Sequence, residues 1–312
     1  MLFLAAFFWG STFVAQSDAA GKLTTFTYLA GRSYVGALAL LIVILGRALF
    51  LSIRRKSAVP KEAEAEPKKK LSLKAVLPGG VVCGIVLTLA AAVQQYGIEK
   101  GATAGEAGFL TALYMFFVPL FAFVLYKKKV GVSYIVGAVL TLAGLYFLCI
   151  FSKGWSSFGL GHVLMIMGAF AYAVHIMFID RYKHVDGLYL SCIQFAVCAV
   201  ISTLLAIAFE HPWRQDILAA WLPIVYAGVL SSAAGFTLQI YGQKYTPAPV
   251  ATVIMSLESV IALFTEWGCA AIGLVGEPFD LVWSQLVGCA LAFAGIVFAQ
   301  LSVSLERKPR AR

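Results

Sequence analysis

Long apolar segments separated by short polar segments dominate the chain. Ten segments are continuously apolar and have about the length that a helix needs to cross a bilayer, roughly 20 residues. They cover residues 2–17, 26–47, 75–96, 104–126, 132–151, 160–180, 188–209, 217–241, 248–272 and 281–302. Strands of a membrane barrel would instead show short segments of alternating polarity. The pattern predicts an all-α integral membrane protein with ten transmembrane helices.

Composition supports this class and excludes several soluble ones. Of the 312 residues, 61% are hydrophobic and 12% are charged, whereas a soluble domain has about 25% charged residues. Disordered chains, collagen and small disulfide scaffolds are excluded by the same values. The six cysteines lie in apolar segments and form no Cys-x-x-Cys pair. We therefore expect neither a disulfide framework nor a metal site.

The basic residues predict the orientation in the membrane. The net charge is +9, and nineteen of the 24 Lys and Arg residues fall on one side of the predicted spans, with four on the other and Arg32 inside a span. Because basic loops stay in the cytoplasm, both termini should lie there, in a multi-pass protein of the plasma membrane. Nucleic-acid binding is not expected, because no basic stripe with interleaved aromatic residues occurs outside the apolar segments.

Two polar segments and the first span add detail. Residues 48–74 are rich in Lys, Glu and Pro, which indicates a solvated, flexible cytoplasmic linker that could also touch anionic lipid. Residues 306–312 form a basic cytoplasmic tail.

The first span follows Met1 without a basic region or a cleavage site, so a signal peptide is not expected. This span is short, and either the helix continues toward Ala20 or residues precede Met1.

The two halves of the chain resemble each other. Leu77-Pro78 and Gln94-Gln95-Tyr96-Gly97 recur as Leu222-Pro223 and Gln239-Ile240-Tyr241-Gly242, all at an offset of 145 residues. We predict one repeat over 1–153 and a second over 154–305. Each would hold five spans, and because five is odd the second copy would enter the membrane from the opposite side. Inverted repeats of this kind are typical of secondary transporters.

Several short motifs also resemble a known family. They are Trp9-Gly10-Ser11-Thr12-Phe13-Val14 with Arg32, Gly108-Phe109-Leu110-Thr111-Ala112-Leu113-Tyr114 with Val118-Pro119-Leu120, Ser256-Leu257-Glu258-Ser259-Val260, Gly276-Glu277, and Gly288-Cys289-Ala290 with Phe293-Ala294-Gly295. Their order is similar to that in the EamA family of the drug/metabolite transporter (DMT) superfamily. The resemblance implies two inverted five-helix repeats, a central cavity, and movement of small metabolites, often outward. The family's Glu-Pro is Glu258-Ser259 here, so the usual proline kink is missing.

Ionisable residues inside the spans are candidates for function, since each costs ~2.5–3.5 kcal/mol to place in a bilayer. Arg32 could bind an anionic group of a substrate or could tie helices together. Glu258 lies near the middle of the ninth span and is the candidate for coupling to protons, because a buried carboxylate holds a proton readily; a brace between helices is the alternative. Glu266 follows two turns later, so both carboxylates can face one sector. Glu106 is expected to act at a helix start.

Uncharged polar and aromatic residues form stripes on several helices. Such stripes must face protein or water, so we favour a shared cavity over scattered helix–helix hydrogen bonds. The cavity candidates besides Arg32 and Glu258 are Trp9, Thr12, Gln16, Gln94, Thr111, Tyr114, Tyr172, His175, Gln239 and Ser256. His162 and His175 are thirteen residues apart and cannot share a helix face. They are not expected to form a metal pair.

These features together predict a secondary transporter, in the direction of export, of small organic metabolites such as amino acids or related compounds. Transport would occur by alternating access at a cavity between the repeats. The expected partners are a small-molecule substrate and the lipid bilayer, with protons as the coupling option. The sequence shows no Walker motif, His-Glu-x-x-His or Gly-x-Ser-x-Gly, so we expect neither an enzyme nor a cofactor. A membrane-embedded enzyme, a non-transporting membrane protein and a channel are the alternatives, and the oligomeric state is left open.

Overall fold

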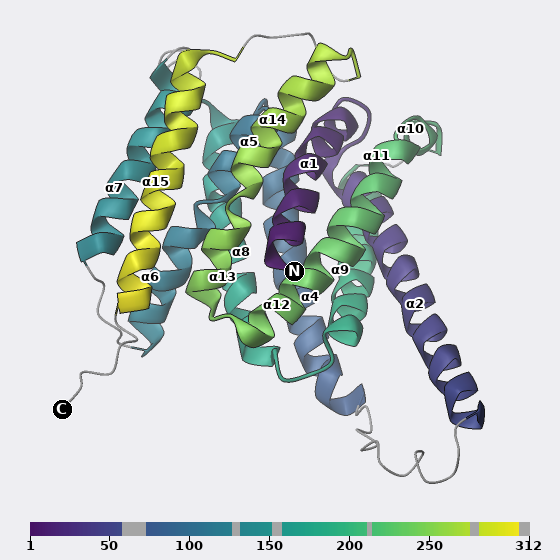
Figure 1. Ribbon diagram of the computed structural model, residues 1–312. Coiled ribbons are helices and arrows are strands. Elements are labelled where there is room, and N and C mark those ends of the chain that lie inside the picture. The colour runs from purple at the N-terminus through teal and green to yellow at the C-terminus, as the bar shows by residue number, and fades with distance from the viewer. Residues whose placement is uncertain (58–72, 127–131, 152–157, 211–213, 275–280, 306–312) are drawn as a thin grey trace, which may run out of the picture.

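The computed structural model describes residues 1–57, 73–126, 132–151, 158–210, 214–274 and 281–305, and these residues form helices joined by turns (Figure 1). The helices of the first half are α1 (Leu2–Ala20), α2 (Thr25–Ser57), α4 (Leu73–Glu99), α5 (Ala104–Thr111), α6 (Tyr114–Tyr126), α7 (Val132–Leu145) and the π-helical η1 (Tyr146–Phe151). Those of the second half are α8 (Leu160–Tyr182), α9 (Gly187–Phe209), α10 (Arg214–Ala219), α11 (Trp221–Tyr226), the π-helical η3 (Ala227–Gly235), α12 (Phe236–Tyr245), α13 (Ala248–Met255), α14 (Glu258–Ala271) and α15 (Trp283–Leu305).

Each of the ten predicted segments is helical over most of its described residues. Seven segments of the described chain are long and apolar enough to cross a membrane, and 135–144 and 283–295 are shorter apolar helices. The 19-residue α1 is not among the seven. The all-helical membrane fold therefore agrees with the prediction, whereas ten crossings stay a prediction.

Three helix boundaries differ from the sequence-based expectation. Helix α1 continues to Ala20, which is one of the two alternatives for the short first span. The flexible linker predicted over 48–74 is wrong at its edges, because α2 runs to Ser57 and α4 begins at Leu73. Residues 48–57 contain no Gly or Pro and include several good helix formers, so nothing in them ends the helix. Residues 58–72 and the tail 306–312 lie outside the described residues.

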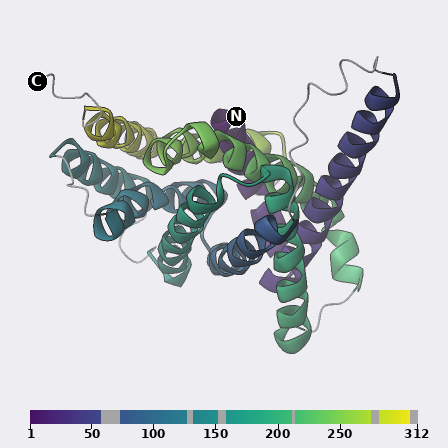
Figure 2. The ribbon, with the colours of Figure 1, turned by 90° about the horizontal axis from the view of Figure 1, so that it is seen from below.

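The helices run between two ends of the molecule, named here as they appear in Figure 1. The turns at 21–24 and 100–103 lie at the upper end, and the turns at 183–186 and 246–247 lie at the lower end. Helix α1 is central, in contact with α14, η3 and α5, while α2 packs on α9 and α4 packs on α8 and α9. Figure 2 shows α7 and α15 side by side at one edge.

Small residues bring α7 and α15 together. Added side-chain carbons at Gly144 or Gly295 would lie within 3 Å of backbone atoms of the facing helix. Gly144 meets Gly288 and Ala292, while Gly295 meets Gly137 and Thr141. The two small-residue faces visible in the sequence therefore contact each other, as is common between membrane helices.

The fourth and ninth predicted segments are each interrupted in the middle. Helix α5 ends at Thr111 and α6 begins at Tyr114, while α13 ends at Met255 and α14 begins at Glu258. The second interruption occurs without the proline that the resemblance implied. Hydroxyl groups supply the cause, since Ser256 Oγ donates to the carbonyl of Val253 (2.7 Å) and Ser259 Oγ to that of Ser256 (2.8 Å). Such bonds compete with the backbone and bend helices.

Candidate functional site

A cavity lies at the centre of the bundle, where helices of both halves meet. It is lined by Trp9, Phe13, Gln16, Arg32, Gln94, Thr111, Tyr114, Tyr172, His175, Ile176, Ser231, Phe236, Gln239 and Glu258. About 40 Å³ is open to the centre of a water molecule, which is room for a few waters, at ~10–15 Å³ each. Side chains must therefore move before an organic molecule can enter.

Ten of the twelve cavity candidates named from the sequence line this space. The exceptions are Thr12 and Ser256, whose hydroxyls bond to the backbone of their own helices, at the carbonyls of Phe8 and Val253. The sequence did not single out four lining residues: Phe13, Ile176, Ser231 and Phe236. Three of these are apolar residues in apolar helices, where no change in polarity marks the inner face.

Arg32 places a positive charge in the cavity. It is 6% exposed, and its guanidinium donates to Ser231 Oγ through Nη2 (2.8 Å) and to Ser232 Oγ through Nε (3.3 Å). The group also lies 5.8 Å from the centre of the Tyr28 ring. These partners are neutral, and within the described ranges Arg32 makes no ion pair. A buried charge without a counter-ion is costly, so the site favours an anionic group on a bound molecule.

Glu258 places a carboxyl group in the same cavity. It is 2% exposed and lies in the first turn of α14, directly after the interruption, where the helix dipole favours a negative charge. Tyr114, which follows the interruption between α5 and α6, is close enough to interact with it. Neither Glu258 Oε1 nor the Tyr114 hydroxyl makes a hydrogen bond of good geometry among the described residues, although the two groups interact with each other. A ligand that binds either oxygen would therefore compete with this contact.

A hydrogen-bonded network forms one wall of the cavity. Gln94 of α4 accepts from Gln16 (3.3 Å) and from the Tyr172 hydroxyl (3.1 Å), and its Nε2 donates to Thr111 (2.8 Å). Gln16 also donates to Gln95 (3.2 Å) and accepts from it through its backbone carbonyl. The network joins α1, α4 and α5 of the first half to α8 of the second. The buried amides are thereby satisfied, as such groups must be.

Aromatic rings form another part of the cavity wall. Trp9 lies 4.9 Å from Phe236 between ring centres, and His175 packs on the edge of Phe236 at 5.8 Å. His175 Nε2 is 3.2 Å from Gln194 Oε1. In the part of the chain that the structure describes, Trp9 Nε1 and Gln239 Oε1 are buried without a partner. His175 Nδ1 has no partner there either, and it is an acceptor when Nε2 donates to Gln194. The wall therefore offers apolar surface, one free donor and two free acceptors.

Two further carboxylates inside the predicted spans, Glu106 and Glu266, lie above the cavity. Glu106 and Thr103 form a capping box at the start of α5, in agreement with the role expected for Glu106. Glu266 accepts from the backbone N–H groups of Ala104 (3.1 Å) and Gly105 (2.7 Å). Neither carboxylate lines the cavity. The described residues contain no group of three or more His, Cys, Asp or Glu that could hold a metal ion.

A sequence model of the EamA-like transporter family matches residues 1–150 and 159–301. The chain belongs to this family. The match confirms the resemblance seen in the motifs and makes the protein a membrane transporter of the EamA type.

Relatives of this EamA-like transporter carry the same general description. An "Uncharacterized transporter" of Archaeoglobus fulgidus is 24% identical over 304 residues, which is 97% of this chain and 85% of the relative. The "Uncharacterized transporter YdfC" of Bacillus subtilis is 24% identical over 215 residues, 67% of each chain. A protein of known crystal structure shares the fold with a TM-score of 0.67 and 18% identity, covering 98% of this chain and 97% of the other.

Proposed function

We propose that this EamA-like transporter is a secondary carrier that exports small organic metabolites, such as amino acids or related compounds, across the plasma membrane. The central cavity would open alternately to either side as one five-helix half rocks against the other. Both termini would lie in the cytoplasm, so that the upper end of Figure 1 faces outward.

Two inverted halves are supported by several relations between them. The family matches the chain twice, once in each half. The interruptions that follow Thr111 and Met255 lie 144 residues apart, within one residue of the offset of the sequence repeat. Equivalent helices also make equivalent contacts across the two halves. Helix α4 contacts α8 as the segment α11 to α12 contacts α1, and α5 and α6 contact α8 as α13 and α14 contact α1. This pattern is what a two-fold axis between the halves would produce.

The observation that carries the proposal is the presence of opposite charges in one buried cavity. Arg32 comes from the first half and Glu258 from the second, and Tyr172 lies within the electrostatic range of both. A substrate with an anionic group and an amino group could satisfy both side chains at once, while the rings of Trp9 and Phe236 contact its apolar part. Amino acids and related compounds have this chemistry.

Coupling to protons would require one group in the cavity that can exchange a proton as the site opens. Glu258 suits this role because it is buried and Oε1 makes no hydrogen bond of good geometry among the described residues. A proton and a substrate amino group could then occupy this carboxylate in turn. The alternative role of Glu258 is a brace between α14 and α6.

The first test compares the metabolites in the medium of cells that express the wild type or Glu258→Gln at equal membrane levels. Glu99→Gln is the matched control, because Glu99 bonds to Thr25 outside the cavity. We expect one class of metabolites to accumulate with the wild type and the control but not with Glu258→Gln. Accumulation with all three would assign Glu258 the role of a brace and leave the carrier intact. No change in the medium with any of them would contradict export, and uptake into cells would then be measured.

A further inference from the structure

Three layers follow one another from the cavity to the upper end of the molecule. On α8, Tyr172 lines the cavity, Ala169 and Met165 come next, and His162 lies above them. These residues are spaced by three or four positions and therefore share one face of the helix. The face changes from polar to apolar and back to polar.

The same order occurs on α14 and α5, which pack against each other. On α14, Glu258 lines the cavity, Ala262 is buried above it, and Glu266 lies one helical turn further toward the upper end. On α5, Thr111 lines the cavity and Ala107 lies above it, below the helix start with its backbone N–H groups.

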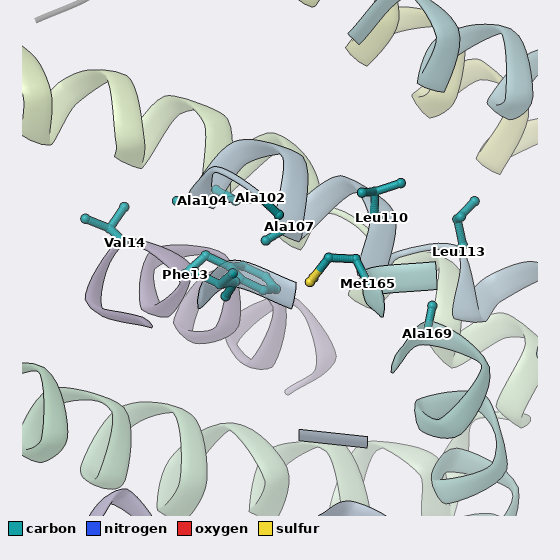
Figure 3. Close-up of a cluster of buried hydrophobic side chains, with 11 residues drawn as sticks. Phe13, Val14, Ala102, Ala104, Ala107, Leu110, Leu113, Met165 and Ala169 are labelled. Atoms are coloured by element: carbon teal, nitrogen blue, oxygen red, sulfur yellow. The ribbon is translucent and has the colours of Figure 1, made fainter. Parts of the chain in front are cut away.

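The middle layer is a closed apolar cluster, which Figure 3 shows in close-up. It is formed by Phe13, Val14, Ile98, Ala102, Ala104, Ala107, Leu110, Leu113, Met165, Ala169 and Ala262. Its side chains come from both halves, with Met165, Ala169 and Ala262 from the second. Contact is tight, because a side-chain carbon added at Gly108 would lie 2.5 Å from the Cβ of Ala262. No open path from the cavity to the upper end can pass through such packing.

The upper layer is a polar clasp around the start of α5. Glu266 of α14 accepts from the N–H groups of Ala104 and Gly105 (3.1 and 2.7 Å). From the other side, His162 of α8 places Nε2 3.4 Å from Glu106 Oε2, with both side chains 7% exposed. His162 Nδ1 accepts from the Gly159 N–H (3.2 Å), so the proton of a neutral ring would lie on Nε2, toward the carboxylate. Two residues of the second half therefore hold one helix start of the first.

We infer that Glu266 and His162 are positioning residues that keep the upper exit of the cavity closed. Passage to this side requires α5 to separate from α14 and α8, and that movement breaks the clasp and opens the apolar cluster. The two hydrogen bonds that Glu266 accepts are charge-assisted, and such bonds are stronger than those between neutral groups. The clasp therefore lowers the fraction of molecules in which the upper exit is open. This inference deepens the proposed function and rests on its alternating access.

The test measures access to the cavity and needs no knowledge of the substrate. Ile176 lines the cavity, is 2% exposed and has an apolar side chain that takes no part in the hydrogen bonds of the site. Ile176→Cys, in a chain with the native cysteines replaced by alanine, would report the rate of reaction with a membrane-impermeant maleimide added to the upper side. The reaction is compared with and without Glu266→Gln, Glu266→Ala or His162→Leu. Gly108→Ala is a further variant, which places a new side-chain carbon inside the apolar cluster.

Two variants serve as matched controls. Gly268→Ala changes a glycine of α14 that has open space where the new carbon would lie. Glu99→Gln neutralises a carboxylate of α4 that bonds to Thr25, away from the clasp. Labelling from the lower side is measured for every variant, and correct folding is checked by size-exclusion chromatography.

We expect labelling from the upper side to increase about tenfold in Glu266→Ala and in Gly108→Ala, because a loss of ~1.4 kcal/mol from the closed state changes a population tenfold. Glu266→Gln and His162→Leu should give smaller increases, and the controls none. Wild-type labelling rates in folded Glu266→Gln and Gly108→Ala would overturn the inference, even if Glu266→Ala did not fold. Labelling requires no transport. If expression of the protein leaves the metabolites in the medium unchanged, export is therefore contradicted, while the inference about the clasp still depends on the labelling rates alone.

Discussion

The guanidinium of Arg32 in α2 donates a 2.8 Å hydrogen bond to Ser231 Oγ in η3, 199 residues further along the chain. The bond joins the two halves of the bundle at the cavity wall. It also leaves the charge of Arg32 without a carboxylate partner among the described residues. Under the proposed function, binding of a substrate carboxylate and packing of the two halves would therefore be linked through one side chain.

Replacement of Arg32 should separate binding from stability. We expect Arg32→Gln to reduce transport of carboxylate-bearing substrates at least about tenfold, by loss of a charged hydrogen bond of ~1.5–3 kcal/mol. The Tm should stay unchanged or rise, because an uncompensated buried charge is removed. Arg32→Lys keeps the charge and should retain part of the transport. Transport kinetics and thermal unfolding check both points, and an equal loss for substrates without a carboxylate would contradict the assignment.

The Gln94 network should contribute more to stability than any single bond in it. Tyr172→Phe removes one hydrogen bond and should lower the free energy of unfolding by about 1 kcal/mol. Gln94→Leu also leaves the hydroxyls of Thr111 and Tyr172 without this partner, and should cost at least twice as much. Thermal unfolding in one detergent gives the comparison. Equal Tm values for the two variants would show that the network is not cooperative.

The closeness of α1 and α14 depends on Gly10. A side-chain carbon there would lie 2.6 Å from the carbonyl oxygen of Glu258 and 2.7 Å from the Cβ of Ile261. Gly10→Ala should therefore destabilise the protein by ~1–3 kcal/mol and reduce transport, since it displaces Glu258. Gly46→Ala has nothing within 4 Å and should be neutral or stabilising by up to about 1 kcal/mol. Equal Tm values for Gly10→Ala and Gly46→Ala would contradict the role given to Gly10.

The interruption between α13 and α14 should depend on two hydroxyl groups. Ser256→Ala with Ser259→Ala removes the bonds to the carbonyls of Val253 and Ser256 and lets the helix continue. We expect a folded protein with Tm equal to or above that of the wild type, but with transport reduced several-fold, because Glu258 shifts with the helix start. Full transport in this double variant would show that the interruption has another cause.

The polar stripes made the cavity predictable to a large extent. Trp9 and Gln16 stand out from an apolar helix and both line the space, whereas Phe13 lies between them and gives no contrast in polarity. Ser231 was missed for another reason. It lies in η3, where the π-helical backbone turns differently from 3.6 residues per turn, so a search for helical spacing does not find its face.

The helix interruptions and the clasp were less accessible to sequence reasoning. Hydroxyl groups that bond to their own backbone look the same in a sequence as hydroxyl groups that face a ligand, and Thr12 and Ser256 proved to be of the first kind. Glu266 could be assigned to the same sector as Glu258, but its partners are backbone groups of α5, 161 and 162 residues away. Only the packing of the two halves brings them together.

The π-helical segment η3 has a consequence for the resting state of the carrier. Helix α4, at the equivalent place in the first half, is α-helical along its whole length. In a carrier built from two inverted copies, exchange of their conformations converts the form open to one side into the form open to the other. Identical copies would populate both forms equally. Because the copies differ in this wall, the two forms of the proposed carrier would differ in free energy, and the empty protein would favour the form open to one side of the membrane.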